Sequence, residues 1–365
     1  MRRIVMDQNN DMLGMLNLIP TPAFCVRDGV IVSANSAAIG RMVEPGTPIA
    51  QLIKIGREEY SEFSEGCLYL QLEIAGVSQN ASVSHVQDYH IFTLEQDDDH
   101  RELQAMALVA MELRKPLSGI MSTAEQLFPM AELNGNPETR EQAAWMNRGL
   151  YQMHRVINNM SDAILYASGS VPRKEVREIC GVLNEIFARA ADSIQHTGAR
   201  LEYTGLSEPI YTQFSTEYLE RAVLNMLTNA VKFIGQDNMI RAKLTRKEKK
   251  LYLSIENSCS ENLEFPSGSV FYRYIREPAL EDKRFGIGLG MVLIRCTAAA
   301  HNGTVLVDHP EDGIIRVTLS LAIESGRGNI LRSPGMQVDY TGERDHTLIE
   351  LSEILPPESY TPDIF

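Results

Sequence analysis

The sequence predicts a multidomain α+β protein, and three patterns along the chain indicate it. Residues 14–95 have the pattern of a small mixed α/β unit, and residues 67–95 within it alternate in the way typical of antiparallel strands. Residues 98–168 carry apolar residues at steps of three and four, the spacing of amphipathic helices. Residues 172–324 alternate helical and strand-like segments, which is typical of a two-layer α/β domain. With 365 residues, the chain is long enough for two or three such units.

Composition argues against several classes of function. The net charge of −14 argues against a general nucleic-acid or anionic-membrane binder. No run approaches the roughly 20 apolar residues of a membrane span, and the first residues lack the apolar core of a signal peptide. The cysteines lie far apart without a CxxC pair, so we expect free thiols and no zinc site. We therefore expect a cytoplasmic protein that contacts other proteins, with no nucleic-acid partner and no membrane span.

The N-terminal region has the pattern of a small sensor module. The stretch TPAFCVRDGVIVSAN predicts two strands joined by a turn at Asp28-Gly29, and SAAIGRMV predicts a short helix. The residues that follow predict antiparallel strands with turns near Gly76 and Asp88. This order, and DGVIVSAN above all, resembles a PAS domain, the sensor module of many signalling proteins, which we expect over residues 1–97.

Residues 98–169 predict a helical hairpin. The first helix, residues 98–128, has an apolar stripe formed by Met106, Val109, Leu113, Leu117, Ile120, Ala124 and Leu127. The second helix, residues 139–168, has a stripe formed by Ala143, Met146, Leu150, Met153, Ile157, Met160, Ile164 and Ala167. Two antiparallel helices cannot bury both stripes alone, and the usual solution is to pair with a second copy. We therefore expect a dimeric four-helix bundle and a homodimer.

Two motifs between residues 170 and 324 suit the binding of phosphate. In RAVLNMLTNAVKF, Asn225, Asn229 and Lys232 fall at i, i+4 and i+7 and so share one helix face. Two amides and one amine suit a magnesium ion and its phosphates, although a solvated helix face would show the same pattern. In RFGIGLGMVLIR, three glycines precede an apolar helix, where backbone N–H groups can approach a phosphate; a flexible turn is the alternative.

Taken together, these motifs resemble the ATP-binding domain of histidine kinases, which is related to the ATPase domains of gyrase and Hsp90. The resemblance implies ATP and Mg²⁺ as ligands over residues 170–324, with Asn229 on the metal. It also implies nucleotide contacts from Asn225, Lys232 and Asn257, from Phe271, Tyr272 and Arg273 before the nucleotide lid, and from Gly286, Gly288 and Gly290 in the glycine box. A tail follows over residues 325–365, partly extended, with one or two helical turns expected in HTLIELSEILPP.

The first hairpin helix fits the same family. Its MELRKPLSG stretch resembles the phosphoacceptor pattern H-E-L-R-x-P-L, with matches at Glu112, Leu113, Arg114, Pro116 and Leu117. Pro116 lacks a backbone N–H and should bend the helix. The order of sensor, dimerising hairpin and ATP domain is that of a two-component sensor kinase. This order implies a response regulator or another histidine kinase as the partner.

The departures from the family pattern concern the reacting positions. Met111 stands where the family has its phosphoacceptor histidine, and a thioether is a weak nucleophile that gives no stable phosphoryl product. We expect Met111 on the outer face of the helix, as a remnant of that position. Glu112, the base of the family, then has nothing to deprotonate. Lys115 stands where the family uses Thr or Asn for dephosphorylation.

The D-x-G-x-G box of the family is altered as well. Asn257 takes the Asp position, and Cys259 and Glu261 take its two glycines. We expect the lost charge to cost about 1–2 kcal/mol of ATP binding. His100, His154 and His301 are candidate substitute acceptors, and His154 is expected on the surface of the second helix, off the apolar stripe.

Three hypotheses about function follow. The first is a histidine-kinase-like signalling protein without histidine autophosphorylation, a pseudokinase that acts through partner contacts controlled by nucleotide or ligand. The second is an active ATP-dependent protein kinase that phosphorylates a partner chain. The third is a scaffold that binds no nucleotide, with the acidic tail as its partner-binding element.

Overall fold

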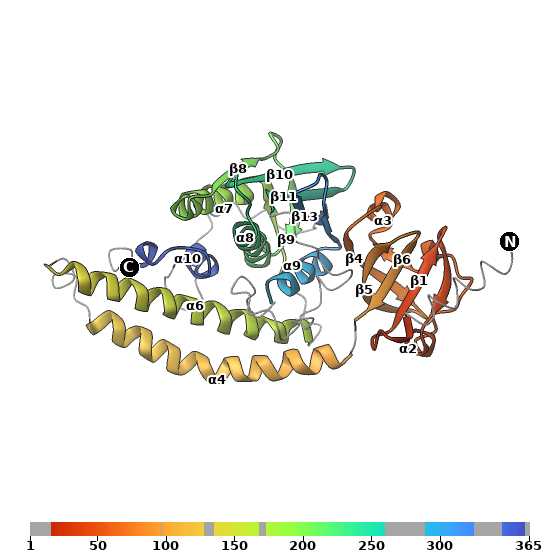
Figure 1. The fold of residues 1–365 in the computed structure, drawn as a ribbon, viewed down its shortest axis with the longest axis horizontal. Coiled ribbons are helices and arrows are strands. Elements are labelled where there is room, and N and C mark those ends of the chain that lie inside the picture. The colour runs from red at the N-terminus through yellow and green to blue at the C-terminus, as the bar shows by residue number, and fades with distance from the viewer. Residues whose placement is uncertain are drawn as a thin grey trace.

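The computed structural model describes residues 16–95, 97–127, 135–167, 173–259, 289–324 and 345–361. Figure 1 shows three groups of elements: an N-terminal sheet unit at one end, a long helical hairpin along the base, and an α/β unit above the hairpin. The last described segment of the chain lies between the hairpin and the α/β unit. Within the described ranges, no helix combines the length and apolarity needed to span a bilayer.

The N-terminal unit is built from antiparallel strands, as the alternation predicts. Its elements are β1 (Ala23–Arg27), β2 (Val30–Ala34), α2 (Ser36–Gly40), η1 (Ile49–Gln51), β3 (Ile53–Ile55), α3 (Arg57–Glu62), β4 (Cys67–Ile74), β5 (Val77–Val86) and β6 (Tyr89–Leu94). The turn between β1 and β2 places Asp28 and Gly29 at φ 50° and 75°, a left-handed pair that tight hairpins require. The strands, the short helix and the turns near Gly76 and Asp88 are confirmed.

The hairpin consists of α4 (Asp97–Leu127) and α6 (Pro137–Ala167), which confirms both predicted helices. The helix α4 runs unbroken through Pro116, and Figure 1 shows its axis as a bow. Its predicted apolar stripe is only partly buried: Leu117 and Ala124 pack against α6, whereas the other two core residues of α4 lie one position away from stripe residues. Those core residues are Ala110, Leu117, Met121 and Ala124 of α4, with Leu150 and Ile157 of α6.

Several other residues of the predicted stripes face outward. Val109, Leu113 and Ile120 are exposed, each by about half of the side chain. Met146 and Met153 of α6 are exposed too. The apolar residues of each helix therefore form two adjacent faces, and only one of these faces packs within the hairpin.

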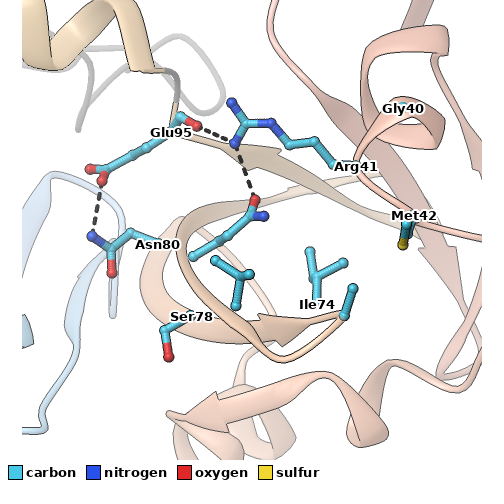
Figure 2. A pocket seen from close by; sticks show the side chains of 10 residues that line it. Gly40, Arg41, Met42, Ile74, Ser78, Asn80 and Glu95 are labelled. Atoms are coloured by element: carbon cyan, nitrogen blue, oxygen red, sulfur yellow. Dashed lines mark hydrogen bonds between the residues drawn. The ribbon is translucent and has the colours of Figure 1, made fainter.

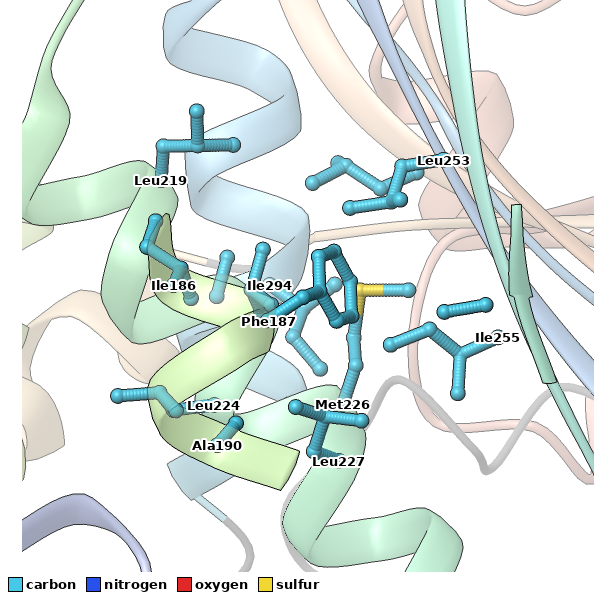
Figure 3. Close-up of a cluster of buried hydrophobic side chains, with 14 of the residues drawn as sticks. Ile186, Phe187, Ala190, Leu219, Leu224, Met226, Leu227, Leu253, Ile255 and Ile294 are labelled. Carbon is cyan, nitrogen blue, oxygen red and sulfur yellow. The ribbon is translucent and has the colours of Figure 1, made fainter. Parts of the chain in front are cut away.

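The α/β unit packs three helices against a sheet. Its elements are β7 (Glu175–Glu178), α7 (Ile179–Ile194), η2 (Gln195–Thr197), β8 (Arg200–Thr204), β9 (Tyr211–Phe214), α8 (Thr216–Lys232), β10 (Met239–Lys247), β11 (Lys250–Ser258), α9 (Leu289–Ala300), β12 (Val305–Asp308) and β13 (Ile314–Ala322). Figure 3 shows the core between helices and sheet, where Phe187, Met226 and Ile294 meet Leu253 and Ile255 of β11. The two-layer pattern is confirmed for the described elements.

The two sheet units join into one sheet, which the sequence analysis does not anticipate. Strand β12 pairs antiparallel with β4, and the sheet runs in the order β2-β1-β6-β5-β4-β12-β13-β11-β10-β8, with β3 beside β4. Glu59 of α3 crosses the junction, accepting from Lys250 Nζ at 2.8 Å and from Tyr252 Oη at 3.2 Å. Glu95 pairs with Arg295 of α9 at 2.6 Å. The N-terminal unit is thus docked directly on the α/β unit.

The tail folds back into the core. The helix α10 (His346–Glu350) confirms the predicted helical turns, and η4 (Pro357–Tyr360) follows. Leu348, Ile349, Leu351, Leu355 and Tyr360 are buried and belong to the core of the α/β unit. Tyr360 also accepts a hydrogen bond at its carbonyl from Asn147 Nδ2 of α6, at 3.2 Å. The tail segment, residues 345–361, therefore ties the hairpin to the α/β unit.

Candidate functional site

The helix α8 carries the polar stripe formed by Asn225, Asn229 and Lys232. Ser215 caps its N-terminus, where the Ser215 hydroxyl accepts from Tyr218 N and the Ser215 amide donates to His301 Nε2 at 3.0 Å. The apolar side chains of the helix are buried in the core, which turns the polar stripe toward α6 and the tail segment. The three predicted residues are therefore brought to one face, as their spacing predicts.

Asn225 lies at the centre of this face and is 1% exposed. Its Nδ2 donates to the Arg221 carbonyl at 2.8 Å and to Glu350 Oε2 at 3.3 Å, and its Oδ1 accepts from Arg155 Nη2 at 3.0 Å. A Cβ atom at Gly290 would lie 2.9 Å from Asn225 Oδ1, so only glycine fits there without a shift. The structure thus places the last glycine of the predicted glycine box directly against Asn225.

Two carboxylates of the tail segment cover the polar stripe. Glu350 is fully buried, 3.0 Å from Arg221 Nε and 3.5 Å from Arg155 Nε. Glu353 pairs with Arg155 Nη1 and with Lys232 Nζ. Asn229, the predicted metal ligand, is half-buried beside them. The amide and the amine expected to meet phosphates meet acidic side chains instead.

The negative charges of these two carboxylates are balanced by basic side chains from three elements. Burial opposes ionisation of Glu350, but Arg221, Arg155 and His346 outweigh it and hold the pKa of Glu350 below its ordinary value. Burial likewise opposes ionisation of Glu353, and Arg155 and Lys232 lower its pKa. Both carboxylates are therefore ionised at neutral pH. Because they are buried, both carboxylates depend on these basic partners to remain ionised.

His346, at the start of α10, adds a titratable group to this set. Its Nδ1 lies 3.6 Å from Glu220 Oε2. Glu217, Glu350 and Arg221 are the other charged groups that act on it. Burial disfavours the protonated ring, but Glu220 and Glu350 raise the pKa of His346 above its ordinary value. The ring is therefore protonated over a wider pH range in the docked tail than in free chain.

The ionic partners of the stripe were not predicted from the sequence. They are Arg155, Arg221, Glu350 and Glu353, and they come from three separate elements. One signal for the tail was available. HTLIELSEIL places Leu348, Ile349, Leu351 and Leu355 on an otherwise acidic tail, and such a stripe predicts a buried face.

Asn257 lies at the end of β11 and is 5% exposed. Its Nδ2 donates to the Phe233 carbonyl at 3.4 Å and to the Ser258 carbonyl at 2.8 Å. An aspartate carboxylate could make neither contact, because it only accepts hydrogen bonds. The amide therefore links the strand end to the residue that follows α8. Cys259 is half-buried, and Glu261 lies outside the described residues.

Met111 lies on the solvent face of α4 with 60% of its side chain exposed, as the helix arithmetic predicts. Glu112 and Lys115 are exposed beside it. Arg114 donates across the hairpin to Ser161 Oγ at 3.2 Å. The position at which the family pattern has a histidine is therefore accessible, and the group on it is a thioether.

Two of the candidate substitute acceptors, His154 and His301, are buried and not placed to react. His154 is 4% exposed, so its expected surface position is wrong; it lies on the face of α6 that is covered by the rest of the structure. His301 is buried as well, and burial lowers its pKa to about 4. Its Nδ1 lies 2.7 Å from the Thr297 carbonyl and its Nε2 accepts from Ser215. The side chain of His100 lies outside the described residues, as do Phe271, Tyr272, Arg273, Gly286 and Gly288.

A pocket lies in the N-terminal unit, between α2 and the β4–β5 hairpin. Figure 2 shows Arg41 at its rim, donating from Nη1 to Gln79 Oε1 at 3.1 Å and to the Glu95 carbonyl at 2.7 Å. Asn80 Nδ2 donates to Glu95 Oε2 at 2.9 Å. The same Glu95 pairs with Arg295 of α9. A molecule in this pocket would thus lie one residue away from the junction between the two sheet units.

Comparisons with known proteins agree with the position of the polar stripe. The sequence model for histidine kinase-, DNA gyrase B-, and HSP90-like ATPases matches residues 215–325, which include α8 and α9. Among the described residues, no group of three or more His, Cys, Asp or Glu side chains is placed to hold a metal ion. The metal role of Asn229 therefore stays a prediction.

Several sensor kinases are similar to the chain over a larger region. Sensor protein KdpD of Clostridium acetobutylicum is 22% identical over 231 residues, which cover 60% of this chain and 25% of KdpD. Adaptive-response sensory kinase SasA of Gloeothece citriformis is 26% identical over 220 residues, covering 56% of this chain and 53% of SasA. The chain thus spans between a quarter and about half of the length of these relatives.

Histidine kinases are among the solved structures that match the chain in part. The histidine kinase ThkA, solved in complex with the response regulator protein TrrA, matches with a TM-score of 0.39 at 14% identity. The match covers 84% of this chain and 96% of ThkA. Residues 215–325 belong to the family of histidine kinase-, DNA gyrase B- and HSP90-like ATPases, and the chain that carries them is a homologue of the sensor histidine kinases.

Proposed function

We propose that this chain is a two-component signalling protein that does not phosphorylate itself on histidine and acts through regulated contacts with partners. In this proposal residues 1–97 are a PAS-like sensor, residues 98–169 a dimerisation hairpin, and residues 170–324 an ATPase-type domain. The tail over residues 325–365 supplies the segment that holds the last two together. A response regulator or a second histidine kinase is the proposed partner, in keeping with the relatives, which are sensor kinases.

The observation that carries the proposal is the exposed Met111. The hairpin presents this position to solvent, as phosphotransfer would need, yet the side chain there has no nitrogen to attack a phosphorus atom. His154 and His301 are buried and cannot take its place without opening the fold. The scaffold of the reaction is thus kept while the reacting group is absent.

Three contacts support a route for a signal from the N-terminal unit. Glu95 lines the pocket beside Arg41 and also pairs with Arg295 of α9. Glu59 contacts Lys250 and Tyr252 of β11. A ligand that moves Glu95 would therefore act on the ATPase-type domain directly, and not only through the hairpin helices.

A homodimer forms part of the proposal, with a second copy of this chain on the exposed apolar face of the hairpin. That face carries Val109, Leu113, Ile120, Trp145 and Met153, which are all large, apolar and between 46% and 55% exposed. Exposed apolar groups of this size are unusual on a monomer surface and mark an interface. The face lies next to the buried hairpin seam, so pairing of two hairpins would complete a four-helix bundle.

Phosphate transfer from ATP tests the proposal. The full chain and a Met111→His variant are incubated with Mg²⁺ and ATP labelled at the γ-phosphate, and acid-labile label on the protein is measured. We expect none on the natural chain. Acid-labile label on the natural chain, assigned to a histidine by mass spectrometry, would overturn the proposal.

One observation favours a second function, phosphorylation of a partner chain. Gly290 lies against Asn225, and half-buried Asn229 completes the stripe, so part of the nucleotide-binding geometry of the family is kept. Label on Met111→His with none on the natural chain would show that the ATPase-type domain is active and lacks only an acceptor. The partner-directed kinase would then replace the pseudokinase.

A further inference from the structure

Two helices from different units present a cluster of basic side chains beneath the tail segment. Arg155 comes from α6 of the hairpin, and Arg221 and Lys232 come from α8. Their side chains are between 7% and 11% exposed. We call these three residues the basic cluster. Because one member belongs to the hairpin, the cluster exists only while the hairpin and the ATPase-type domain are docked.

The tail segment supplies two carboxylates to this cluster, three residues apart. Glu350 contacts Arg221 and Arg155, and Glu353 contacts Arg155 and Lys232. Arg155 thus lies between the two carboxylates. A polyphosphate, like this segment, presents several negative charges at short intervals along a chain. The basic cluster is therefore an anion-binding site by its composition, and the chain itself provides the anion.

The same contacts exclude a second anion. Asn225 Nδ2 and Lys232 Nζ, two donors of the polar stripe, point at Glu350 and Glu353. A phosphate chain placed on them would meet two carboxylates and the backbone of α10 at close range. The site therefore does not fit a nucleotide triphosphate while the tail is docked. If the tail left, the same residues would offer three cations and two amides to the phosphates.

We propose that the basic cluster is a latent polyphosphate site which this chain fills with its own tail, so that a polyphosphate and residues 345–361 compete for Arg155, Arg221 and Lys232. This proposal rests on the proposed function in one respect, that the polar stripe is the nucleotide-binding face of the ATPase-type domain. It does not depend on the loss of autophosphorylation. The ligand class is a linear polyphosphate, either inorganic or the triphosphate of a nucleotide.

Competition has a reciprocal consequence. A ligand that binds only the open form must favour the open form, and every change that weakens tail docking must strengthen ligand binding by the same factor. If the docked tail is favoured about 100-fold, the apparent affinity of the polyphosphate falls by about 100-fold as well. A partner that captures the tail would then switch the site on.

Variants of the full chain test this without removing the buried part of the tail. Glu353→Gln removes one anion from the edge of the cluster, where its side chain is 28% exposed, and leaves Glu350 and the apolar anchors in place. Glu358→Gln is the matched control, because Glu358 is exposed on the same segment. Inorganic tripolyphosphate and ATP are titrated separately by calorimetry, and amide exchange of the tail is followed by mass spectrometry at saturation.

We expect Glu353→Gln to bind tripolyphosphate at least tenfold more tightly than the natural chain, and Glu358→Gln to match the natural chain. Bound tripolyphosphate should speed exchange over residues 345–361 and leave β11 unchanged. Binding with unchanged tail exchange, equal affinity in all three proteins, or no binding to Glu353→Gln would each overturn the proposal. Displacement of the tail by tripolyphosphate but not by ATP would assign the site to inorganic polyphosphate. No phosphate is transferred to the protein in the tripolyphosphate arm, so the proposed function can fail independently.

Discussion

Replacing Glu350 with glutamine is the most informative single change to the docked tail. Glu350 is the only fully buried carboxylate among the described residues of the tail segment, and it contacts Arg221, Arg155 and Asn225 at 3.0, 3.5 and 3.3 Å. Glutamine keeps the shape and one acceptor oxygen. It removes the charge and turns one end into a donor that faces other donors.

The size of the effect follows from the contacts that remain. Removing one partner of a buried ion pair costs about 3–5 kcal/mol when the other is left alone. Here Arg221 keeps Asp162 and Arg155 keeps Glu353, so the loss is smaller. We expect about 2–4 kcal/mol of docking free energy, since hydrogen bonds to charged groups contribute about 1.5–3 kcal/mol each. That loss lowers protection of the tail by a factor of about 30 to 1,000.

Amide hydrogen exchange measures this local free energy. Leu351 N donates to the Thr347 carbonyl at 2.9 Å, and Leu355 N donates to the Leu351 carbonyl at 3.1 Å, so both amides report opening of the tail. Amides of β11 serve as the global reference, because that strand is hydrogen-bonded on both sides, to β10 and to β13. Glu358→Gln is the control for loss of one negative charge from an exposed position of the tail.

The two Leu amides should lose protection in Glu350→Gln while β11 keeps its protection. Less than a threefold change at Leu351 and Leu355 would refute the reasoning, since the buried carboxylate would then contribute little to docking. Equal loss at β11 would also refute it, because the tail would then unfold only with the whole domain.

Three further changes test other parts of the structure. Ile120→Glu should convert the proposed dimer to a monomer in light scattering, because it places a charge on the exposed apolar face, whereas Ser122→Glu, at an exposed polar position, should leave the mass unchanged. Because the pKa of His346 is raised in the folded chain, its contribution to docking is fully present below about pH 6.5 and is lost as the pH rises through the folded pKa. Protection of the tail amides, corrected for intrinsic exchange rates, should therefore fall from pH 6 to 9. The His346→Gln variant should not show this pH dependence. Glu59→Gln should lower the main melting temperature by about 2–4 °C through loss of the junction contacts, and Glu62→Gln, exposed on the same helix, should not change it.

Local patterns predicted the elements of this fold well. Alternation and turn residues located β1 and β2 around Asp28-Gly29, and three-four spacing located α4 and α6. The i, i+4, i+7 spacing correctly placed Asn225, Asn229 and Lys232 on one face, because helix geometry alone decides it. These predictions needed no knowledge of what packs against each element.

The features that failed or were missed depend on contacts between distant parts of the chain. Pairing of β4 with β12 leaves no mark in the periodicity of either strand. The partners of Asn225 lie on α6 and in the tail, and a helix face that meets carboxylates has the same residue pattern as one that meets phosphate. The burial of His154 likewise depends on which elements cover α6, and its position on the helix could not show that.

A calorimetric titration of the natural chain with Mg²⁺-ATP tests the central claim most directly, namely that the ATPase-type domain is held with its polar stripe closed by the tail. The structure predicts no binding heat at submillimolar ATP at neutral pH, because Glu350 and Glu353 are ionised there and occupy Arg155, Arg221 and Lys232. Micromolar, magnesium-dependent binding, with the amides of Leu351 and Leu355 still protected, would contradict it.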